Sequence, residues 1–145
     1  MGSMIDFTRP DGQKVQGWLA EAAQPLASVV VIQEWWGLND QIRGVAQRMA
    51  DAGFTALVPD LYRGQSTVEA EEAHHLMTGL NFGDAASQDV RGALQFLKAR
   101  QAGSGKVGVT GYCMGGALTL LTLTMAAEAD AGVVWYGYPP LEYVD

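Results

Sequence analysis

The sequence has little of three things that would each point to a particular class of protein: cysteine, basic residues and long apolar runs. A single cysteine among 145 residues excludes an intramolecular disulfide and a cysteine-rich zinc site. Nine Lys and Arg residues stand against 16 Asp and Glu residues, which gives a formal net charge of −7. A chain this acidic, without a basic run, is not expected to bind nucleic acid or an anionic membrane surface.

Apolar runs are short as well. The longest, residues 113–127, is too short to cross a bilayer and is interrupted by threonines. The first six residues lack the basic and then apolar pattern of a signal peptide. We therefore expect a cytoplasmic protein, and a single domain over residues 1–145, because this length matches the common size of one domain.

What the sequence does contain is an alternation of strand and helix patterns. Residues 5–7 and 15–20 flank a Pro-Asp-Gly turn and predict a β-hairpin. Apolar runs typical of strands buried on both faces follow at residues 27–33, 54–58, 106–110 and 131–136. Their alternation with helical segments predicts an α/β fold: a mostly parallel sheet with helices on both faces and the hairpin at its leading edge.

Capping residues mark the starts of two of the helices. Asn39 is a good N-cap for a helix that ends at Gly53. Ser66 and Glu69 fit a capping box that would begin the next helix. No helix pattern follows the last strand, residues 131–136, so this apolar strand is expected to be an open edge of a C-terminally incomplete fold.

One motif carries most of the chemical information. The sequence GYCMGG, residues 111–116, lies between a predicted strand and a predicted helix, as in a nucleophile elbow with Cys113 in place of serine. Side chains at Gly111 and Gly115 would collide across such a turn. The turn would place the thiol at a helix N-terminus, which favours the thiolate, and would offer the Met114 N–H to an oxyanion. The alternative is that Cys113 is a small buried residue in a glycine-rich turn.

A second group of residues follows the strand at residues 27–33. Hydrolases with a nucleophile elbow take their other oxyanion donor from a loop in this position. Glu34 ends an apolar strand, where a carboxylate is costly without a partner, and a hydrogen bond to the Cys113 thiol would satisfy both groups. The alternatives are a solvated carboxylate at Glu34 and ordinary core packing for Trp35 and Trp36.

Together these motifs resemble the dienelactone hydrolase family, the carboxymethylenebutenolidases of the α/β-hydrolase fold. The resemblance extends over nearly the whole chain. The segments that carry it are QEWWG at 33–37, VPDLY at 58–62, GKVG at 105–108, GYCMGG at 111–116 and WYG at 135–137. Among them, the GYC-x-GG run is highly specific to this family.

The resemblance implies a reaction and a role for two side chains. Cys113 would be the nucleophile, and Glu34 would hold the resting thiol and help to activate it when substrate displaces the carboxylate. The reaction would be hydrolysis of a small ester or lactone through a thioester intermediate. No metal or other cofactor is implied.

The resemblance also implies the surroundings of the nucleophile. The backbone N–H groups of Trp35 and Met114 would form the oxyanion hole, and Trp36 and Tyr136 would line the substrate pocket. Family members that bind a substrate carboxylate place an arginine where this sequence has Ala70, next to two glutamates. Arg63 is an alternative to that arginine, but we expect it to be a solvated loop cation, so the substrate is expected to be neutral or unrelated to dienelactone.

The rest of the family's triad is missing from the sequence. In the family an aspartate and then a histidine follow the nucleophile along the chain. Asp130 precedes the next strand, at the wrong end of the sheet, Asp145 is the final residue, and no histidine follows Cys113. His74 and His75 precede the nucleophile and are expected at the surface. The sequence therefore resembles the N-terminal portion of such a protein.

Three hypotheses follow. In the first, the chain is a cysteine hydrolase whose base and orienting carboxylate lie on a complementing C-terminal segment. In the second, it is a non-catalytic half-fold that acylates once, stalls, and associates as a homodimer or with a partner over its open edge. In the third, it is a class I amidotransferase, which the residue 33–37 loop and the doubled glycine of the elbow argue against.

Overall fold

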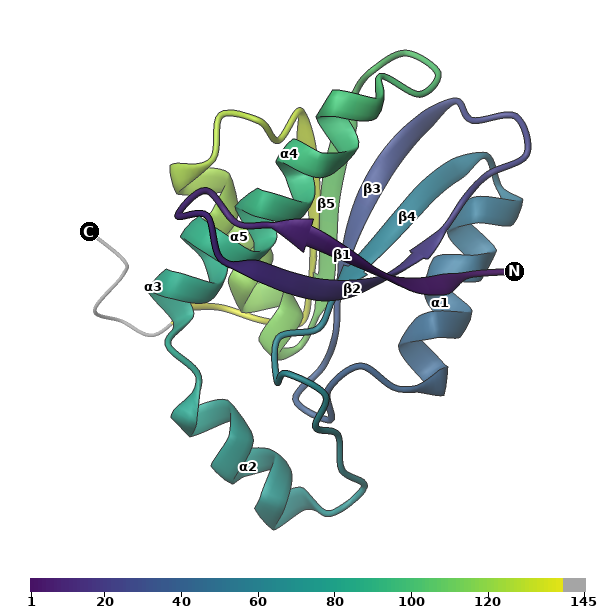
Figure 1. Cartoon of the computed structure of the whole chain (residues 1–145). Helices are drawn as coiled ribbons and strands as arrows, with labels where there is room; N and C mark the ends of the chain where they lie inside the picture. Colours follow the sequence, from purple (N-terminus) through teal and green to yellow (C-terminus); the bar gives the residue numbers. More distant parts are fainter. Residues whose placement is uncertain (140–145) are drawn as a thin grey trace.

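The computed structural model describes residues 1–139, which form a six-stranded sheet between two helical layers (Figure 1). The strands are β1 (Ser3–Thr8), β2 (Lys14–Ala20), β3 (Ala27–Ile32), β4 (Phe54–Pro59), β5 (Val107–Tyr112) and β6 (Ala131–Trp135). Their order is β1-β2-β4-β3-β5-β6. The β1–β2 hairpin runs antiparallel to its neighbour β4, and β4, β3, β5 and β6 are parallel. The predicted α/β fold class and the leading hairpin are confirmed.

Helices cover both faces of the sheet, as predicted. They are α1 (Asp40–Asp51), α2 (Ala70–Gly79), α3 (Phe82–Asp84), α4 (Arg91–Arg100) and α5 (Met114–Met125). Val30 and Ile32 pack with α4 and α5, whereas Val31 between them packs with α1, because successive strand side chains point to opposite faces. Figure 1 shows α1 across the sheet from α4 and α5, with α2 projecting from the edge at which the parallel strands end.

One of the two predicted helix caps is confirmed. The Asn39 side chain accepts a hydrogen bond from the Ile42 N–H at 3.1 Å, and α1 begins directly after it. The capping box is wrong: α2 begins after Glu69, whose side chain makes no capping bond. Ser66 instead forms an isolated β-bridge with Gly37. Ser66 therefore pairs with a distant loop instead of beginning the helix that the local pattern predicted.

The segment before α4 is a π-helix, η1 (Ala85–Val90), and it carries a buried carboxylate. The Asp89 side chain is 2% exposed and accepts hydrogen bonds from Arg9 at 2.9 Å and from Arg63 at 2.8 Å. Arg63 is an exposed loop cation as expected, with its side chain 43% exposed, but its guanidinium is paired with Asp89 and is not free. Through this shared carboxylate the hairpin turn, the loop after β4 and η1 are joined.

Part of one face of the sheet, over β3, β5 and β6, is left uncovered among residues 1–139. An apolar trough of about 390 Å³ runs over β3, β5 and β6 on the α1 face, and Met49 of α1 lines one side of it. Val133 and Trp135 of β6 are 51% and 47% exposed, and β6 is the edge strand among the described residues. The expected open edge is therefore confirmed there, whereas the prediction of a strand buried on both faces is wrong for β6. Within the same residues, no helix has both the length and the apolar character needed to cross a membrane.

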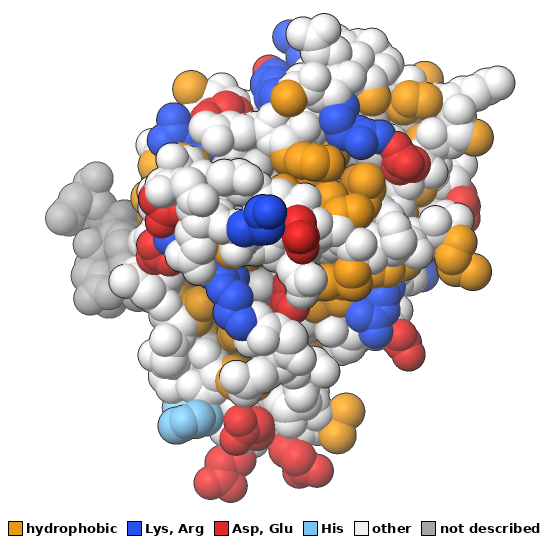
Figure 2. Space-filling model, in the orientation of Figure 1, with side chains coloured by type: hydrophobic (Ala, Val, Ile, Leu, Met, Phe, Trp, Pro, Cys, Tyr) orange, Lys and Arg blue, Asp and Glu red, His pale blue; other side chains and the backbone are white. Residues whose placement is uncertain are grey.

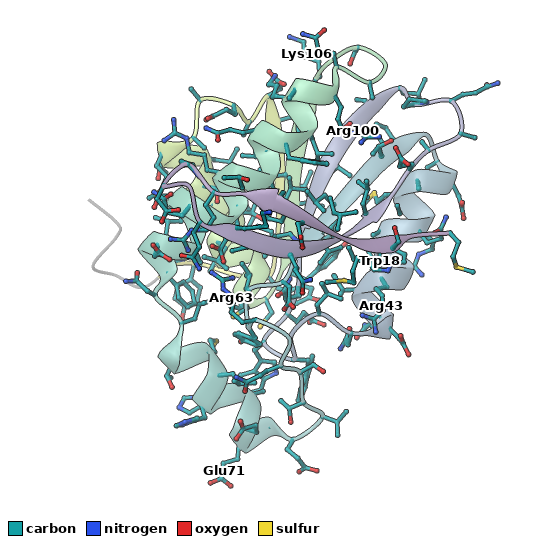
Figure 3. The ribbon with its side chains drawn as sticks, viewed as in Figure 1. Trp18, Arg43, Arg63, Glu71, Arg100 and Lys106 are labelled. Atoms are coloured by element: carbon teal, nitrogen blue, oxygen red, sulfur yellow. The ribbon has the colours of Figure 1, made fainter. Side chains whose placement is uncertain are left out.

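The shared carboxylate predicts an unequal response to the loss of two arginines. Arg9→Met leaves Asp89 buried with one cation instead of two, so the free energy of unfolding should fall by about 3 kcal/mol. Arg43→Met, which removes an exposed i,i+3 pair with Asp40, should cost about 0.5 kcal/mol or less. Figure 3 shows Arg63 and Arg43 in separate parts of the molecule. Urea denaturation measures both values, and equal losses would contradict the role given to Asp89.

Candidate active site

The predicted elbow is a strained turn between β5 and α5. Cys113 has φ 59° and ψ −115°, a conformation that costs a non-glycine residue energy and is frequent at functional sites. Two backbone hydrogen bonds hold it: the Cys113 N–H donates to the Trp135 carbonyl at 3.0 Å, and the Ala117 N–H donates to the Cys113 carbonyl at 3.0 Å. The thiol lies at the N-terminal end of α5 and is partly exposed.

Glycines allow this turn to form. A Cβ at Gly111 would lie 2.1 Å from the Gly115 carbonyl oxygen, and a Cβ at Gly115 would lie 2.3 Å from the Ile32 carbonyl oxygen. The predicted collision across the elbow is therefore real, and a second collision involves the end of β3. Gly137 is equally restricted, because its Cβ would lie 2.1 Å from the Cys113 carbonyl oxygen. The start of α5 is thus in backbone contact with the loops after β3 and β6.

The two predicted oxyanion donors flank this contact. Trp35 lies in the loop after β3, and Met114 is the first residue of α5. Among residues 1–139, neither backbone N–H donates a hydrogen bond. The Trp35 loop is tied down on its other side, where the Thr67 N–H donates to the Trp36 carbonyl at 3.0 Å. Two unused N–H groups at a nucleophile elbow can stabilise a negative oxygen.

Glu34 is bound to Tyr136, and no hydrogen bond joins it to Cys113 within the described residues. The Tyr136 hydroxyl donates to Glu34 Oε2 at 2.9 Å, and Tyr136 has a positive φ of 36°. Tyr136 is 68% exposed. Partial desolvation, the bond to Glu34 and the charge of Glu34 raise the pKa of Tyr136 to about 12, and Cys113 adds to the shift. The elbow, the carboxylate and the tyrosine therefore share one electrostatic environment.

A small polar cavity adjoins these groups. It has a volume of about 210 Å³, and its lining includes Glu34, Trp36, Tyr112, Tyr136 and Arg48. The two residues predicted to bind substrate, Trp36 and Tyr136, thus line the same space. The residues that line it do not include Cys113, so the cavity lies beside the elbow rather than over the thiol.

The other acidic and histidine candidates lie apart from the thiol. Asp130 accepts a hydrogen bond from the Val107 N–H at 2.8 Å, at the start of β5, which confirms its place at the opposite end of the sheet. His74 and His75 are exposed on α2, and the His74 ring meets the Trp35 ring edge-on at 6.5 Å. Asp145 lies outside the described residues.

Two residues of the site were missed by the sequence analysis. Gln33 is fully buried directly before Glu34, and its side-chain amide bridges two backbone groups of the loop after β4. Tyr62, also buried, donates its hydroxyl hydrogen bond to Met114 Sδ at 3.1 Å. A polar side chain at the end of an apolar strand was the available signal for Gln33, but its partners lie 26 and 28 residues away.

Comparison with known proteins gives this arrangement a family. The model of the dienelactone hydrolase family matches residues 15–145, a span that contains the loop after β3, the elbow and the residues after β6. This chain belongs to the dienelactone hydrolase family. Its α/β-hydrolase fold is the fold of this family.

Three of its relatives illustrate the match. Protein usf of Aquifex pyrophilus is 36% identical over 100% of this chain and 65% of its own length. A carboxymethylenebutenolidase of Pseudomonas putida is 31% identical over 92% of this chain and 60% of its own length. A solved dienelactone hydrolase-like promiscuous phosphotriesterase from metagenomic libraries has a TM-score of 0.76 at 30% identity, over 94% of this chain and 59% of that one. The chain thus spans less than two thirds of each of these family members.

The bond between Glu34 and Tyr136 predicts a change in titration. In Glu34→Gln the negative charge that disfavours the tyrosinate is gone, so the pKa of Tyr136 should fall from about 12 toward the ordinary value near 10. The part of the shift caused by partial desolvation should remain. NMR of ¹³Cζ-labelled tyrosine measures the titration, and Tyr136→Phe assigns the signal.

Glu72→Gln is the matched control, because Glu72 carries the same charge on the exposed face of α2. It should leave the Tyr136 titration unchanged. An unaltered pKa in Glu34→Gln would show that the two side chains do not interact in solution.

Proposed function

We propose that this chain supplies the nucleophilic part of a dienelactone hydrolase-type enzyme that cleaves a small ester or lactone. The observation that carries the proposal is the strained elbow: Cys113 sits at positive φ at the start of α5. Among residues 1–139, the N–H groups of Trp35 and Met114 have no acceptor. The match to the family and the Glu34–Tyr136 pair beside the elbow support it.

The proposed first half-reaction forms a thioester. When substrate separates Glu34 from Tyr136, the carboxylate takes the thiol proton, and Cys113 Sγ attacks the carbonyl carbon. The electron pair of the C=O bond moves to oxygen, where the N–H groups of Trp35 and Met114 stabilise the negative charge. Collapse of this intermediate breaks the C–O bond of the ester, and the leaving alkoxide takes the proton from Glu34.

The second half-reaction needs an activated water. Hydrolysis of the thioester would release the carboxylic acid and restore the thiol, but no histidine follows Cys113 in these 145 residues. His74 contacts Trp35 from the exposed side of α2. We therefore propose that this chain alone acylates once and that turnover needs a base from further polypeptide.

The charge around the site favours a neutral substrate, because the one arginine among the described residues that line the cavity, Arg48, is balanced by the one carboxylate, Glu34. Figure 2 shows acidic side chains gathered at the tip where α2 projects, and Arg63 is paired with Asp89. A small acyl group would contact the aromatic side chains of Trp36 and Tyr136, whereas a polyanion such as nucleic acid would be repelled. A reduced thiol nucleophile suits the cytoplasm, where thiols stay reduced.

The open face over β5 and β6 is the proposed site of partner association. Its apolar trough and the exposed strand β6 are of a kind that water-soluble proteins rarely leave uncovered. For the isolated chain we propose a second copy as the partner; in a longer protein or a complex, a complementing segment would take its place.

Sedimentation can test this association. The isolated chain should dimerise at micromolar concentration, and Val133→Asp should shift it to monomer because it places a charge on the exposed face of β6. Val68→Asp is the control, since Val68 is 90% exposed outside the trough. A wild-type monomer at all concentrations would refute the second copy as partner.

Acylation by p-nitrophenyl acetate tests the nucleophile. The wild-type chain should release one equivalent of p-nitrophenolate in a burst and gain the mass of one acetyl group, since deacylation lacks its base. Cys113→Ala should show no burst and no acetylation. Persistent acetylation in that variant would remove Cys113 from the mechanism.

Glu34→Gln is the companion variant. Loss of the carboxylate charge beside the thiol should favour the thiolate and raise the rate of alkylation by iodoacetamide. Equal alkylation rates in wild type and variant would remove Glu34 from the control of the thiol.

A further inference from the structure

The two N–H groups of the proposed oxyanion hole belong to separate parts of the chain. Trp35 follows β3 and Met114 begins α5, 79 residues later by their numbers in the sequence. An oxygen can accept from both N–H groups only if their separation and direction are fixed, because donors stabilise charge when they are held in place beforehand. Something in the fold must therefore set the position of one donor relative to the other.

Gln33 connects the first donor to the loop after β4. Its side chain is fully buried, its Nε2 donates to the Pro59 carbonyl at 2.7 Å, and its Oε1 accepts from the Leu61 N–H at 3.0 Å. Both ends of the amide are thus bound to the same short segment. Since Gln33 lies two residues before Trp35, these two hydrogen bonds to the backbone fix the start of the loop that carries the Trp35 N–H.

Tyr62 connects the same segment to the second donor. Its hydroxyl donates to Met114 Sδ at 3.1 Å, and the Tyr62 side chain is buried. Burial, followed by the effect of Cys113, raises the pKa of Tyr62 above its usual value, so the hydroxyl keeps its proton and remains a donor. The contact with Met114, which directly follows Cys113 in the sequence, places Tyr62 near the nucleophile.

The segment between these two contacts is itself anchored. The Gly64 N–H donates to Asp60 Oδ2 at 2.8 Å, and Arg63 donates to the Asp60 carbonyl at 3.1 Å while its guanidinium is held by Asp89. Residues 59–62 are therefore joined to buried groups at both ends, rather than forming a free loop.

We propose that residues 59–62 are the positioning element of the oxyanion hole, with Gln33 and Tyr62 as positioning residues that set the Trp35 and Met114 N–H groups relative to each other. Neither side chain touches the reacting atoms: Gln33 acts through the backbone that leads to Trp35, and Tyr62 acts through the side chain of Met114. This inference rests on the proposed role of Cys113 and adds two residues to it.

Two reactions of the same thiol separate this role from a merely structural one. Acylation by p-nitrophenyl acetate passes through a tetrahedral oxyanion and uses the hole. Alkylation by iodoacetamide displaces iodide from a saturated carbon and forms no oxyanion. A change in the thiol or its accessibility alters both rates, whereas a misplaced N–H group alters acylation alone.

The test measures both rates for Gln33→Met and Tyr62→Phe in the full chain. Each variant should acylate about tenfold more slowly or worse, because loss of one oxyanion donor costs at least this much, while its alkylation rate stays within about twofold of wild type. Tyr62→Phe removes a single hydroxyl, so it keeps the test decisive if Gln33→Met does not fold.

Thr55→Val is the matched control. The Thr55 side chain is buried and accepts a hydrogen bond from the Ala22 N–H at 3.1 Å at the start of β4, away from the elbow. The Thr55→Val variant loses a buried polar contact of similar kind, and it should change neither the acylation rate nor the alkylation rate.

Equal losses in both reactions, or unchanged acylation in a folded variant, would overturn the positioning role. Failure of the proposed function has a different signature: the wild-type chain would not acylate, or Cys113→Ala would acylate as well as wild type. That outcome would overturn this inference together with the function on which it rests.

Discussion

The close approach of α5 to the end of β3 is the constraint on which the site depends. No side chain larger than hydrogen fits at Gly115, because the Ile32 carbonyl oxygen occupies the place of a Cβ. This contact brings the helix start beside the loop that carries Glu34 and Trp35. The burial of Leu118 and Leu121 against the sheet holds α5 in place, so core packing offsets the strain at Cys113.

Features encoded within a few residues could be predicted from the sequence. The period of the apolar residues located the strands and α1, and the glycines around Cys113 indicated the elbow, because each signal depends on backbone geometry that neighbouring residues determine. The Asn39 cap belongs to the same class. The Ser66 capping box failed although its pattern is local, since the bridge to Gly37 comes from another part of the fold.

Features that depend on distant partners could not be predicted. The sequence around Arg63 gives no sign of Asp89, and Gln33 finds its partners only when β3 lies beside β4. The apolar run of β6 has the same composition as the buried runs, and only the lack of a helix pattern after it indicated that the strand would be uncovered. The apolar composition of a segment indicates that it can be buried, but its burial also depends on the elements that pack against it in the fold.

The ion pairs of Arg9 also bear on the order in which the chain can fold during synthesis. Arg9 and Asp89 are separated by 80 positions, so the β1–β2 hairpin can form early but cannot be fastened to the helical layer until η1 has left the ribosome. Until then the hairpin is held to the rest of the sheet only through the pairing of β2 with β4, and it lacks its ion pairs to the helical layer; partly folded chains of this kind associate wrongly. Slow emergence of residues 80–90 would therefore prolong the stage at which the nascent chain is most open to misassembly.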